Sequence, residues 1–205
     1  MPDVTRTFVA LDVPRALMPR FTRLQDELAA DVPGVRWSGA GQAHLTLVFL
    51  GDVPHADLAA VCRAVEEATA GTPRFELSLQ GVGVFPDVQR PRVIWTGVAG
   101  SGLETLVALQ AAVASAAAKS GYPGDSRPYR PHVTLGRFDA GPRGRKPGRK
   151  VEPARPEDLS KLLLRRAKWS AGPFVVQEVI TYSSTLTPEG SVYAPLARAR
   201  LKSSP

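Results

Sequence analysis

Two copies of a short motif that begins with histidine are the residues of this sequence best suited to chemistry. The copies are His44-Leu45-Thr46-Leu47 and His132-Val133-Thr134-Leu135. In a strand alternate side chains share a face, so each motif predicts a strand with an imidazole and a hydroxyl on one side and two buried apolar side chains on the other. An imidazole titrates near neutral pH, so one histidine can accept a proton while the other donates one. Two such strands facing each other predict an acid–base site that suits a phosphate group and needs no metal.

A single His-x-Thr sequence would be interpreted as a hydrogen-bonded residue in the core or at the edge of a sheet. The repetition changes this interpretation, because the sequence around each motif repeats as well. Apolar strand-like runs, Phe8–Leu11 and Val93–Trp95, precede the two motifs at similar distances. Between each run and its motif, apolar residues recur with helical spacing and predict helices at Met18–Ala30 and Leu103–Lys119. Each half of the chain therefore reads as strand, helix and histidine strand, which predicts a diverged duplication.

The rest of the chain alternates helices with short strands. We expect helices at Ala56–Ala70 and Pro156–Ala167, a strand pair of Phe75–Leu79 and Val84–Phe85, a strand at Phe174–Tyr182 and a C-terminal tail at Ala197–Pro205. These elements predict an α+β fold of one domain spanning residues 1–205, with intertwined repeats over approximately 1–90 and 91–200. A doubly wound parallel sheet is the alternative, but no glycine-rich phosphate loop follows an early strand. Gly81 and Gly83 predict a bulge or a close backbone approach instead.

Several short motifs, taken in order, resemble those of a known family. They are Phe8–Pro14, Val35–Trp37, His44–Leu47 with Phe49–Gly51, Gly83–Pro86, Arg130–Arg137, and Tyr182–Ser184 with Gly190 and Tyr193. Their order and spacing resemble the two-histidine phosphoesterase superfamily, and within it the RNA 2′,3′-cyclic phosphodiesterase family, also called 2′-5′ RNA ligase. The main departure is a basic insertion after the second motif. The resemblance implies a bilobal fold with pseudo-twofold symmetry, in which antiparallel sheets line a central cleft and helices lie outside.

The resemblance also implies a reaction, the metal-independent hydrolysis of an RNA or nucleoside 2′,3′-cyclic phosphate to the 2′-phosphomonoester. Ring opening needs a base for the attacking water, an acid for the departing ribose oxygen and donors for the phosphoryl oxygens. The family implies that His132 is the base and His44 the acid; the residues alone also allow the reverse, which would release the 2′ oxygen. Thr46 and Thr134 would donate to the phosphoryl oxygens. With a ribose hydroxyl in place of water, the same chemistry becomes 2′-5′ ligation.

Four further residues are candidates for substrate binding. The resemblance places Arg137 in the pocket, where a guanidinium suits paired phosphate oxygens. In a regular strand Arg137 would share a face with Leu135, so it reaches the cleft only if the chain bends at Gly136. Phe49 and Phe85 are candidates for walls against the nucleoside, although their apolar neighbours are equally typical of a core. Arg130 precedes the second motif in an extended approach loop and is the weaker candidate.

The net charge of +7 is concentrated in one part of the chain. Ten Lys or Arg and three acidic residues lie between Gly141 and Lys168, whereas the rest of the chain is balanced. We interpret 141–155 as a flexible basic loop, because it lacks apolar periodicity. It either attracts an RNA backbone in a salt-sensitive manner or is a solvated insertion without substrate contact.

Composition argues against several classes of protein. No run approaches the roughly 20 apolar residues of a membrane span, and no basic-then-apolar leader begins the chain, so we expect a cytoplasmic protein without a membrane partner. The single cysteine, Cys62, is expected to be an inert thiol on a helix. No His-x-x-x-His, Cys-x-x-Cys or clustered Asp sequence offers a metal site. We therefore expect no cofactor and no metal, a monomer, and as partners RNA ends or nucleotides that carry a 2′,3′-cyclic phosphate.

Other functions would use the same residues. A phosphodiesterase for ADP-ribose 1″,2″-cyclic phosphate or for 2′-5′ oligoadenylate would keep the two motifs and differ in the pocket. A non-catalytic module that binds RNA ends would use the basic segment and the cleft without turnover. Loss of turnover without loss of RNA affinity in His44→Ala separates an enzyme from such a module.

Overall fold

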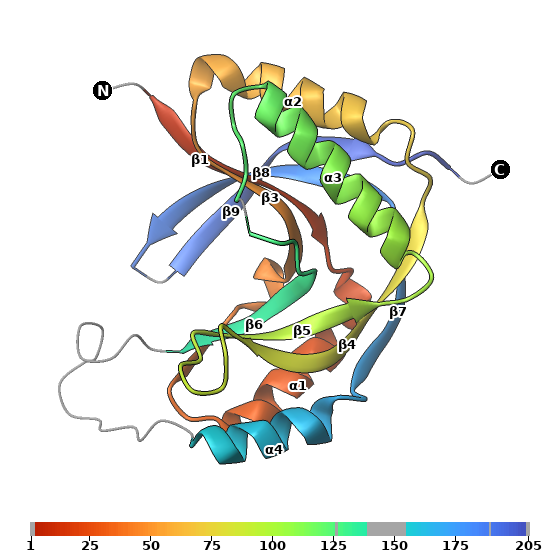
Figure 1. The fold of residues 1–205 in the computed structure, drawn as a ribbon. Coiled ribbons are helices and arrows are strands. Elements are labelled where there is room, and N and C mark those ends of the chain that lie inside the picture. Colours follow the sequence, from red (N-terminus) through yellow and green to blue (C-terminus); the bar gives the residue numbers. More distant parts are fainter. Residues whose placement is uncertain (1–2, 126, 139–154, 189, 204–205) are drawn as a thin grey trace.

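The structure is a computed structural model that describes residues 3–125, 127–138, 155–188 and 190–203 (Figure 1). The basic loop expected at 141–155 lies outside the described residues, except for Arg155 at the start of a helix. The elements are β1 (Val4–Asp12), η1 (Arg15–Leu17), α1 (Met18–Asp31), β2 (Val35–Trp37), η2 (Ala40–Gln42), β3 (His44–Pro54), α2 (His55–Thr69), β4 (Phe75–Phe85), β5 (Val93–Ala99), α3 (Leu103–Lys119), β6 (His132–Phe138), α4 (Pro156–Arg166), β7 (Ser170–Val176), β8 (Glu178–Thr187) and β9 (Gly190–Arg200).

The strands of the described chain form one curled sheet in which every pair of neighbouring strands is antiparallel. Its order is β7-β4-β5-β6-β3-β1-β8-β9, and β2 is added against β6. We call β1, β3, β8 and β9 the upper half and β2, β4, β5, β6 and β7 the lower half, as they lie in Figure 1. The two halves join where β3 meets β6. The predicted α+β class is confirmed, and the parallel alternative is wrong.

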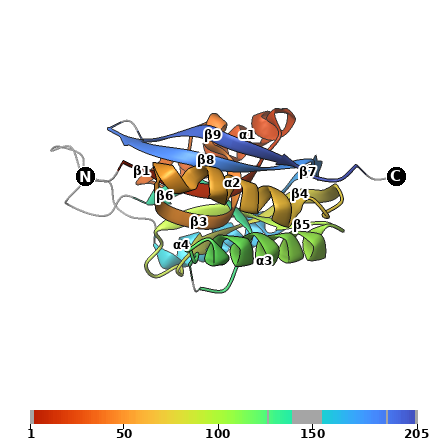
Figure 2. The same ribbon diagram turned by 90° about the horizontal axis from the view of Figure 1, so that it is seen from above.

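Helices cover the outer side of each half. In the upper half α2 and α3 pack against each other and against the strands, as the view from above in Figure 2 also shows. Below the lower half, α1 and α4 lie side by side and are linked by the ion pair of Arg166 with Glu27, at 2.8 Å (Figure 1). Each helix turns one apolar stripe inward; in α1 the buried stripe is Phe21, Leu24, Gln25 and Leu28. The predicted helices are confirmed to within one residue at each end.

The predicted strand Phe174–Tyr182 is wrong, because this segment contains two strands with different partners. β7 pairs with β4 in the lower half and ends at Val176. After Gln177 the chain enters β8, which pairs with β1 in the upper half. Gln177 alone separates the two strands, so the sequence pattern continues while the chain crosses from one half to the other. Each half of the sheet consequently contains strands from both ends of the chain, although the predicted duplication stays a prediction.

Two other strand predictions need correction. Phe75–Leu79 and Val84–Phe85 belong to the single strand β4, and the register against β5 shifts between Gln80 and Val82. The predicted bulge is present at Gly81, which has a φ of +69° and donates its N–H to the carbonyl oxygen of Trp169 at 2.8 Å. The prediction of a C-terminal tail is also wrong for residues 197–200, because these residues belong to β9 and pair with β8.

Gly83 is required for close packing in β4. A Cβ atom at this position would lie 2.2 Å from Cζ2 of Trp95, which is far inside van der Waals contact. We expect Gly83→Ala to lower the free energy of unfolding by about 1–3 kcal/mol, because the indole would have to move. Urea denaturation measures this loss. Gly71→Ala is the matched control, since a Cβ there meets nothing within 4 Å; equal effects of the two substitutions would contradict the prediction.

Candidate active site

The two histidine motifs meet at the junction of the two halves of the sheet. β3 and β6 pair through Leu45 opposite Val133, the residues that follow His44 and His132. Continuing this antiparallel register sets His44 against Thr134 and His132 against Thr46. The four polar residues are half-buried, whereas the intervening Leu45, Leu47, Val133 and Leu135 are almost fully buried. The alternation predicted from the motifs is confirmed, and the pairing brings both imidazoles and both hydroxyls to one face.

Both imidazoles are held by the same kind of hydrogen bond. The Nδ1–H of His44 donates to the carbonyl oxygen of Gln42, and the Nδ1–H of His132 donates to the carbonyl oxygen of Arg130, each at 2.7 Å. A carbonyl oxygen can only accept, so the proton lies on Nδ1 in both rings. Nε2 of each histidine is therefore the nitrogen available to a bound molecule.

The electrostatic surroundings lower the pKa of both histidines. For His44 the largest cause is burial, and the charges of His132 and Arg137 act in the same direction. For His132 burial is again the largest cause, followed in the same direction by the charge of Arg137. The backbone hydrogen bond of each ring opposes these effects and raises its pKa. Asp12 also raises the pKa of His44, whereas no carboxylate among the described residues does so for His132.

A β-bulge at the last residue of each motif, Leu47 or Leu135, changes which of the following side chains face the histidines. In β6, Thr134 lies opposite Trp95 of β5, and Gly136 lies opposite the neighbouring residue Ile94. Leu135 is therefore an extra residue in β6. Leu135 and Gly136 are both buried, and Arg137 is exposed. The alternation is reversed beyond the bulge, and the bend required at Gly136 for Arg137 to reach the site is present. The effect of Arg137 on the pKa of both imidazoles agrees with this position.

The equivalent bulge in β3 exposes Phe49. Thr46 lies opposite Ala10 of β1, and Val48 lies opposite the neighbouring residue Val9, so Leu47 is the extra residue in β3. Leu47 and Val48 are both buried. Phe49 is 54% exposed, which is unusual for a phenylalanine, and its ring centroid lies 6.0 Å from that of Phe8. Phe49 and Arg137 each lie five residues after a histidine, so the two halves present an aromatic ring and a guanidinium at equivalent positions.

Aromatic rings surround both imidazoles. Phe8 lies 4.9 Å from the ring of His44, and Tyr193 meets that ring edge-on at 5.2 Å. Phe85 meets His132 edge-on at 4.9 Å and lies 4.9 Å from Trp95. Phe85 was a predicted site residue; Phe8, Tyr193 and Trp95 were not, although Phe8 and Tyr193 belong to the motifs that carried the resemblance.

Arg130 has a backbone role at the site, while its predicted contact with substrate stays a prediction. Its side chain is exposed in the approach loop, and its backbone carbonyl orients His132. Gln42 has the equivalent backbone role for His44, and its Nε2 also donates to the carbonyl oxygen of Ser191 at 2.5 Å. Sequence reasoning missed Gln42. The signal available was its place two residues before a motif histidine, the same place that Arg130 has.

Asp12 was also missed, because only strand pairing brings it to the site. It lies opposite His44 in the register of β1 and β3, and the hydroxyl of Tyr182 donates to its Oδ1 at 2.6 Å. A cavity of about 460 Å³ begins at Asp12 and extends along the junction of β7 and β8 to Arg74 and Arg200. The histidines do not line this cavity, so it adjoins the candidate site without containing it.

The described residues do not gather three His, Cys, Asp or Glu side chains into a cluster that could hold a metal ion. The side chains that β3 and β6 bring to the site are two imidazoles, two hydroxyls and a guanidinium. Among the helices of the described residues, none is long and apolar enough to cross a membrane.

The fold and the paired motifs define a family. Residues 13–179 match the model of the 2′-5′ RNA ligase superfamily, and the chain belongs to this superfamily. A relative from Methanothermobacter thermautotrophicus, named RNA 2′,3′-cyclic phosphodiesterase, is 33% identical over 96% of this chain and 98% of its own. A relative of the same name from Aquifex aeolicus is 32% identical over 93% of this chain and 94% of its own.

Solved structures have the same fold. Escherichia coli LigT, in complex with 3′-AMP, is 25% identical and superposes with a TM-score of 0.72 over 97% of this chain and 99% of its own. A Thermus thermophilus protein is 26% identical, with a TM-score of 0.71 over 96% of this chain and 97% of its own.

The lowered histidine pKa values predict that acid destabilises the fold. A group with a pKa below its unfolded value binds fewer protons in the folded chain, so its contribution is complete above about pH 6.5 and declines as the pH falls below that value. We expect the free energy of unfolding, measured in urea, to fall between pH 7 and pH 5, and to fall less in His44→Gln and His132→Gln. The exposed His55, which lies 2.8 Å from the hydroxyl of Thr5, provides the control His55→Gln. A slope equal to wild type in the first two variants would contradict the prediction.

Proposed function

We propose that the chain hydrolyses RNA or nucleoside 2′,3′-cyclic phosphates to 2′-phosphomonoesters, with His132 as general base and His44 as general acid. The observation that carries this proposal is the junction of β3 and β6, where two imidazoles present Nε2 and both Nδ1 atoms are engaged by carbonyl oxygens. The names of the relatives from Methanothermobacter thermautotrophicus and Aquifex aeolicus support the substrate class.

The proposed reaction moves one proton at each histidine. Nε2 of His132 takes a proton from water as the water oxygen bonds to phosphorus, and the bond between phosphorus and the 3′ oxygen breaks. Nε2–H of His44 gives its proton to that oxygen, which leaves a 3′ hydroxyl and a 2′-phosphate. Thr46 and Thr134 donate to the non-bridging oxygens, with preorganised donors of this kind worth roughly 2.7–4 kcal/mol each. Arg137 neutralises charge on the same oxygens.

One difference between the two histidines supports this direction of proton transfer, because Asp12 raises the pKa of His44 and has no counterpart at His132 among the described residues. Burial and Arg137 lower the pKa of both rings, and the charge of His132 lowers that of His44 further. The general acid must start protonated, and Asp12 next to His44 favours the imidazolium form. The general base must start neutral, and His132 has the charge of Arg137 without an opposing carboxylate among the described residues. The same arrangement run with a ribose hydroxyl in place of water would form a 2′-5′ linkage.

The aromatic side chains favour a nucleoside at the upper half. Phe49 offers an exposed ring beside Phe8, on the side of the site opposite Arg137. Base–aromatic stacking contributes about 1–3 kcal/mol per base. Phe85 lies against His132 and Trp95 and forms the wall on the lower side. We further propose that the protein acts as a cytoplasmic monomer on free RNA ends.

The test is hydrolysis of a nucleoside 2′,3′-cyclic phosphate with EDTA present and with the product isomer identified. We expect turnover to the 2′-phosphate, and loss of turnover by at least about a hundredfold in His44→Ala and in His132→Ala. His55→Ala, which removes the remaining histidine, is the control and should keep wild-type activity.

Other results would point to specific alternatives. A 3′-phosphate product would reverse the roles of the two histidines, and loss of activity with EDTA would contradict the metal-free mechanism. Turnover confined to ADP-ribose 1″,2″-cyclic phosphate or 2′-5′ oligoadenylate would change the substrate. RNA affinity without any turnover would indicate a binding module.

The role of Asp12 predicts a shift in the pH profile. Asp12→Asn keeps an oxygen that accepts from Tyr182 but removes the charge next to His44. We expect the basic limb of kcat/KM against pH, which reports the general acid of the free enzyme, to move to lower pH, while the acidic limb moves less. In wild type this basic limb should already lie below pH 6.5, because the pKa of His44 is lowered. A uniform loss at every pH, without a shift, would contradict the role of Asp12.

A further inference from the structure

The lower half presents two arginines side by side at the candidate site. Arg36 in β2 lies opposite Arg137 in β6, and residues directly opposite each other in an antiparallel pair share a face. Arg137 is also opposite Val93, which is itself opposite Phe85, so Arg36 lies in the same cross-strand row as two predicted site residues. Both arginines are exposed.

Like charges directly opposite each other destabilise a sheet, so this pair costs stability unless an anion offsets it. In the described part of the chain, neither guanidinium has an ion pair or a side-chain hydrogen bond. The upper half differs, because Arg6 in β1 lies opposite Asp52 in β3. The strand pairing therefore leaves an excess of positive charge on the lower half only.

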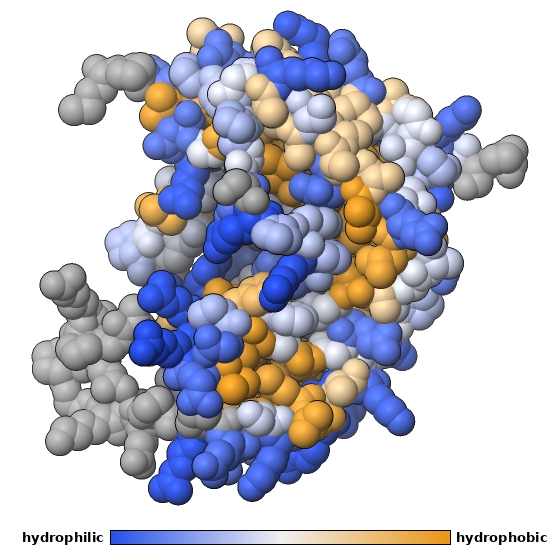
Figure 3. Space-filling view, viewed as in Figure 1, coloured by the Kyte–Doolittle hydropathy of each residue, from blue (hydrophilic) through white to orange (hydrophobic). Residues whose placement is uncertain are grey.

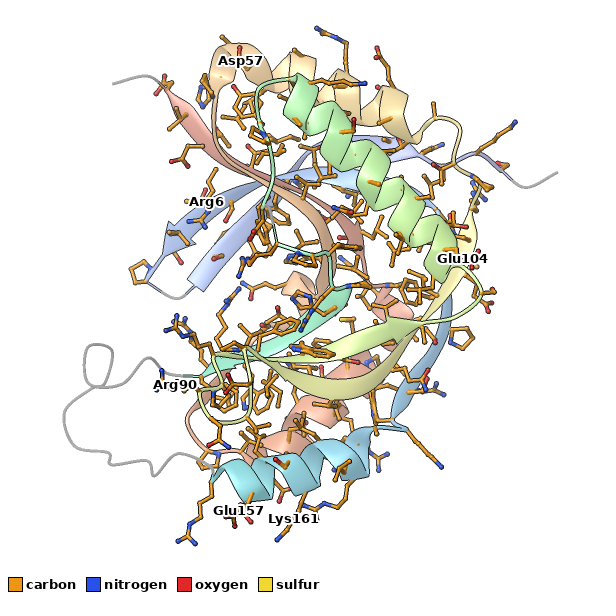
Figure 4. All side chains as sticks on the ribbon, in the orientation of Figure 1. Arg6, Asp57, Arg90, Glu104, Glu157 and Lys161 are labelled. Atoms are coloured by element: carbon orange, nitrogen blue, oxygen red, sulfur yellow. The ribbon has the colours of Figure 1, made fainter. Side chains whose placement is uncertain are left out.

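A third arginine extends this charge to the open end of the molecule. Arg90 lies in the turn between β4 and β5, and the backbone carbonyl oxygen of Arg92 in the same turn accepts the N–H of Phe138 at the end of β6. Figure 4 shows Arg90 at the open end of the lower half and Arg6 on the upper half across from it. Oδ1 of Asp87 accepts the N–H groups of Gln89 and Arg90 and closes the turn, and the ion pairs of the described residues do not include one between Asp87 and Arg90. Figure 3 shows hydrophilic side chains around the hollow between the halves.

The opposite end of the site is less suited to an anion. Asp12 and Glu178 line the cavity at the junction of β7 and β8, together with Arg74 and Arg200, and Arg198 pairs with Glu178. Acidic residues and arginines occur together at this end, whereas the only charged residues in the row of Phe85, Val93, Arg137 and Arg36 are the two arginines. A polyanion that begins at the histidines would therefore extend towards Arg36 and Arg90.

We propose that Arg36 and Arg90 bind the phosphodiester backbone of a single-stranded RNA, on the 5′ side of the nucleotide that reacts. This inference rests on the proposed function, because an RNA that ends in a 2′,3′-cyclic phosphate continues only through its terminal 5′ oxygen. Arg137 binds the reacting phosphate and Arg36, on the neighbouring strand, binds the next one. The site therefore prefers an oligonucleotide to a mononucleotide, and the preference depends on salt.

The experiment compares two substrates, a nucleoside 2′,3′-cyclic phosphate and a short oligoribonucleotide with the same terminal cyclic phosphate. In Arg36→Ala/Arg90→Ala we expect kcat/KM for the oligonucleotide to fall by about tenfold and that for the mononucleotide to change much less. The slope of log kcat/KM against log salt for the oligonucleotide should decrease by about 0.7 for each phosphate contact removed. Arg63→Ala/Arg23→Ala, on the outer helices α2 and α1, removes the same net charge and should preserve the preference for the oligonucleotide.

A second measurement does not depend on turnover. Fluorescence anisotropy with a labelled oligoribonucleotide that ends in a 2′-phosphate should show weaker binding to Arg36→Ala/Arg90→Ala than to the control pair. Equal effects on the two substrates, or unchanged affinity, would overturn the backbone site. Absence of turnover in wild type, with the difference in affinity retained, would instead contradict the proposed function and leave the backbone site in place.

Discussion

The pairing of β3 with β6 is the interaction on which the rest of this structure depends. A single pair of opposed residues, Leu45 and Val133, joins two halves of a sheet that are otherwise covered by separate helices. Both residues are buried to about 1% exposure or less, so the junction is fixed by apolar packing as well as by the backbone. Because side chains alternate along a strand, burying this pair turns the neighbouring histidines and threonines to the concave face. The same contact therefore closes the sheet and assembles the polar site.

The site also combines opposing electrostatic requirements within a small space. Burial and the nearby Arg137 disfavour charge on both imidazoles, whereas the reaction that we propose requires one imidazole to be positively charged. The two backbone carbonyl hydrogen bonds and Asp12 offset part of this cost, and Asp12 does so on one side only. A nearly symmetric arrangement of strands thus contains two histidines in different environments. This difference is what a reaction with a separate acid and base requires.

Much of the site could be predicted from the sequence, because the information is local. The spacing of His44 and Thr46, and its repetition at His132, indicates which side chains share a face before any partner strand is known. The helices carry a similar local signal in their apolar stripes. Asp12 and Gln42 carried no such signal: Asp12 reaches His44 through the register of β1 and β3, and Gln42 acts through its backbone carbonyl. The bulges beyond each motif also depend on how neighbouring strands pair, so the sequence allowed the bend at Gly136 without requiring it.

The crossing of the chain between β7 and β8 has a consequence for how the site forms. β1 lies between β3 and β8, and β8 is more than 165 residues further along the chain. Neither half of the sheet is complete until its last strands have been made, since β7 finishes the lower edge and β8 and β9 the upper one. Contacts between such distant segments carry a large loop-closure entropy and slow the folding reaction. During synthesis the surroundings of His44 therefore remain incomplete until Tyr182 in β8 and Tyr193 in β9 have left the ribosome.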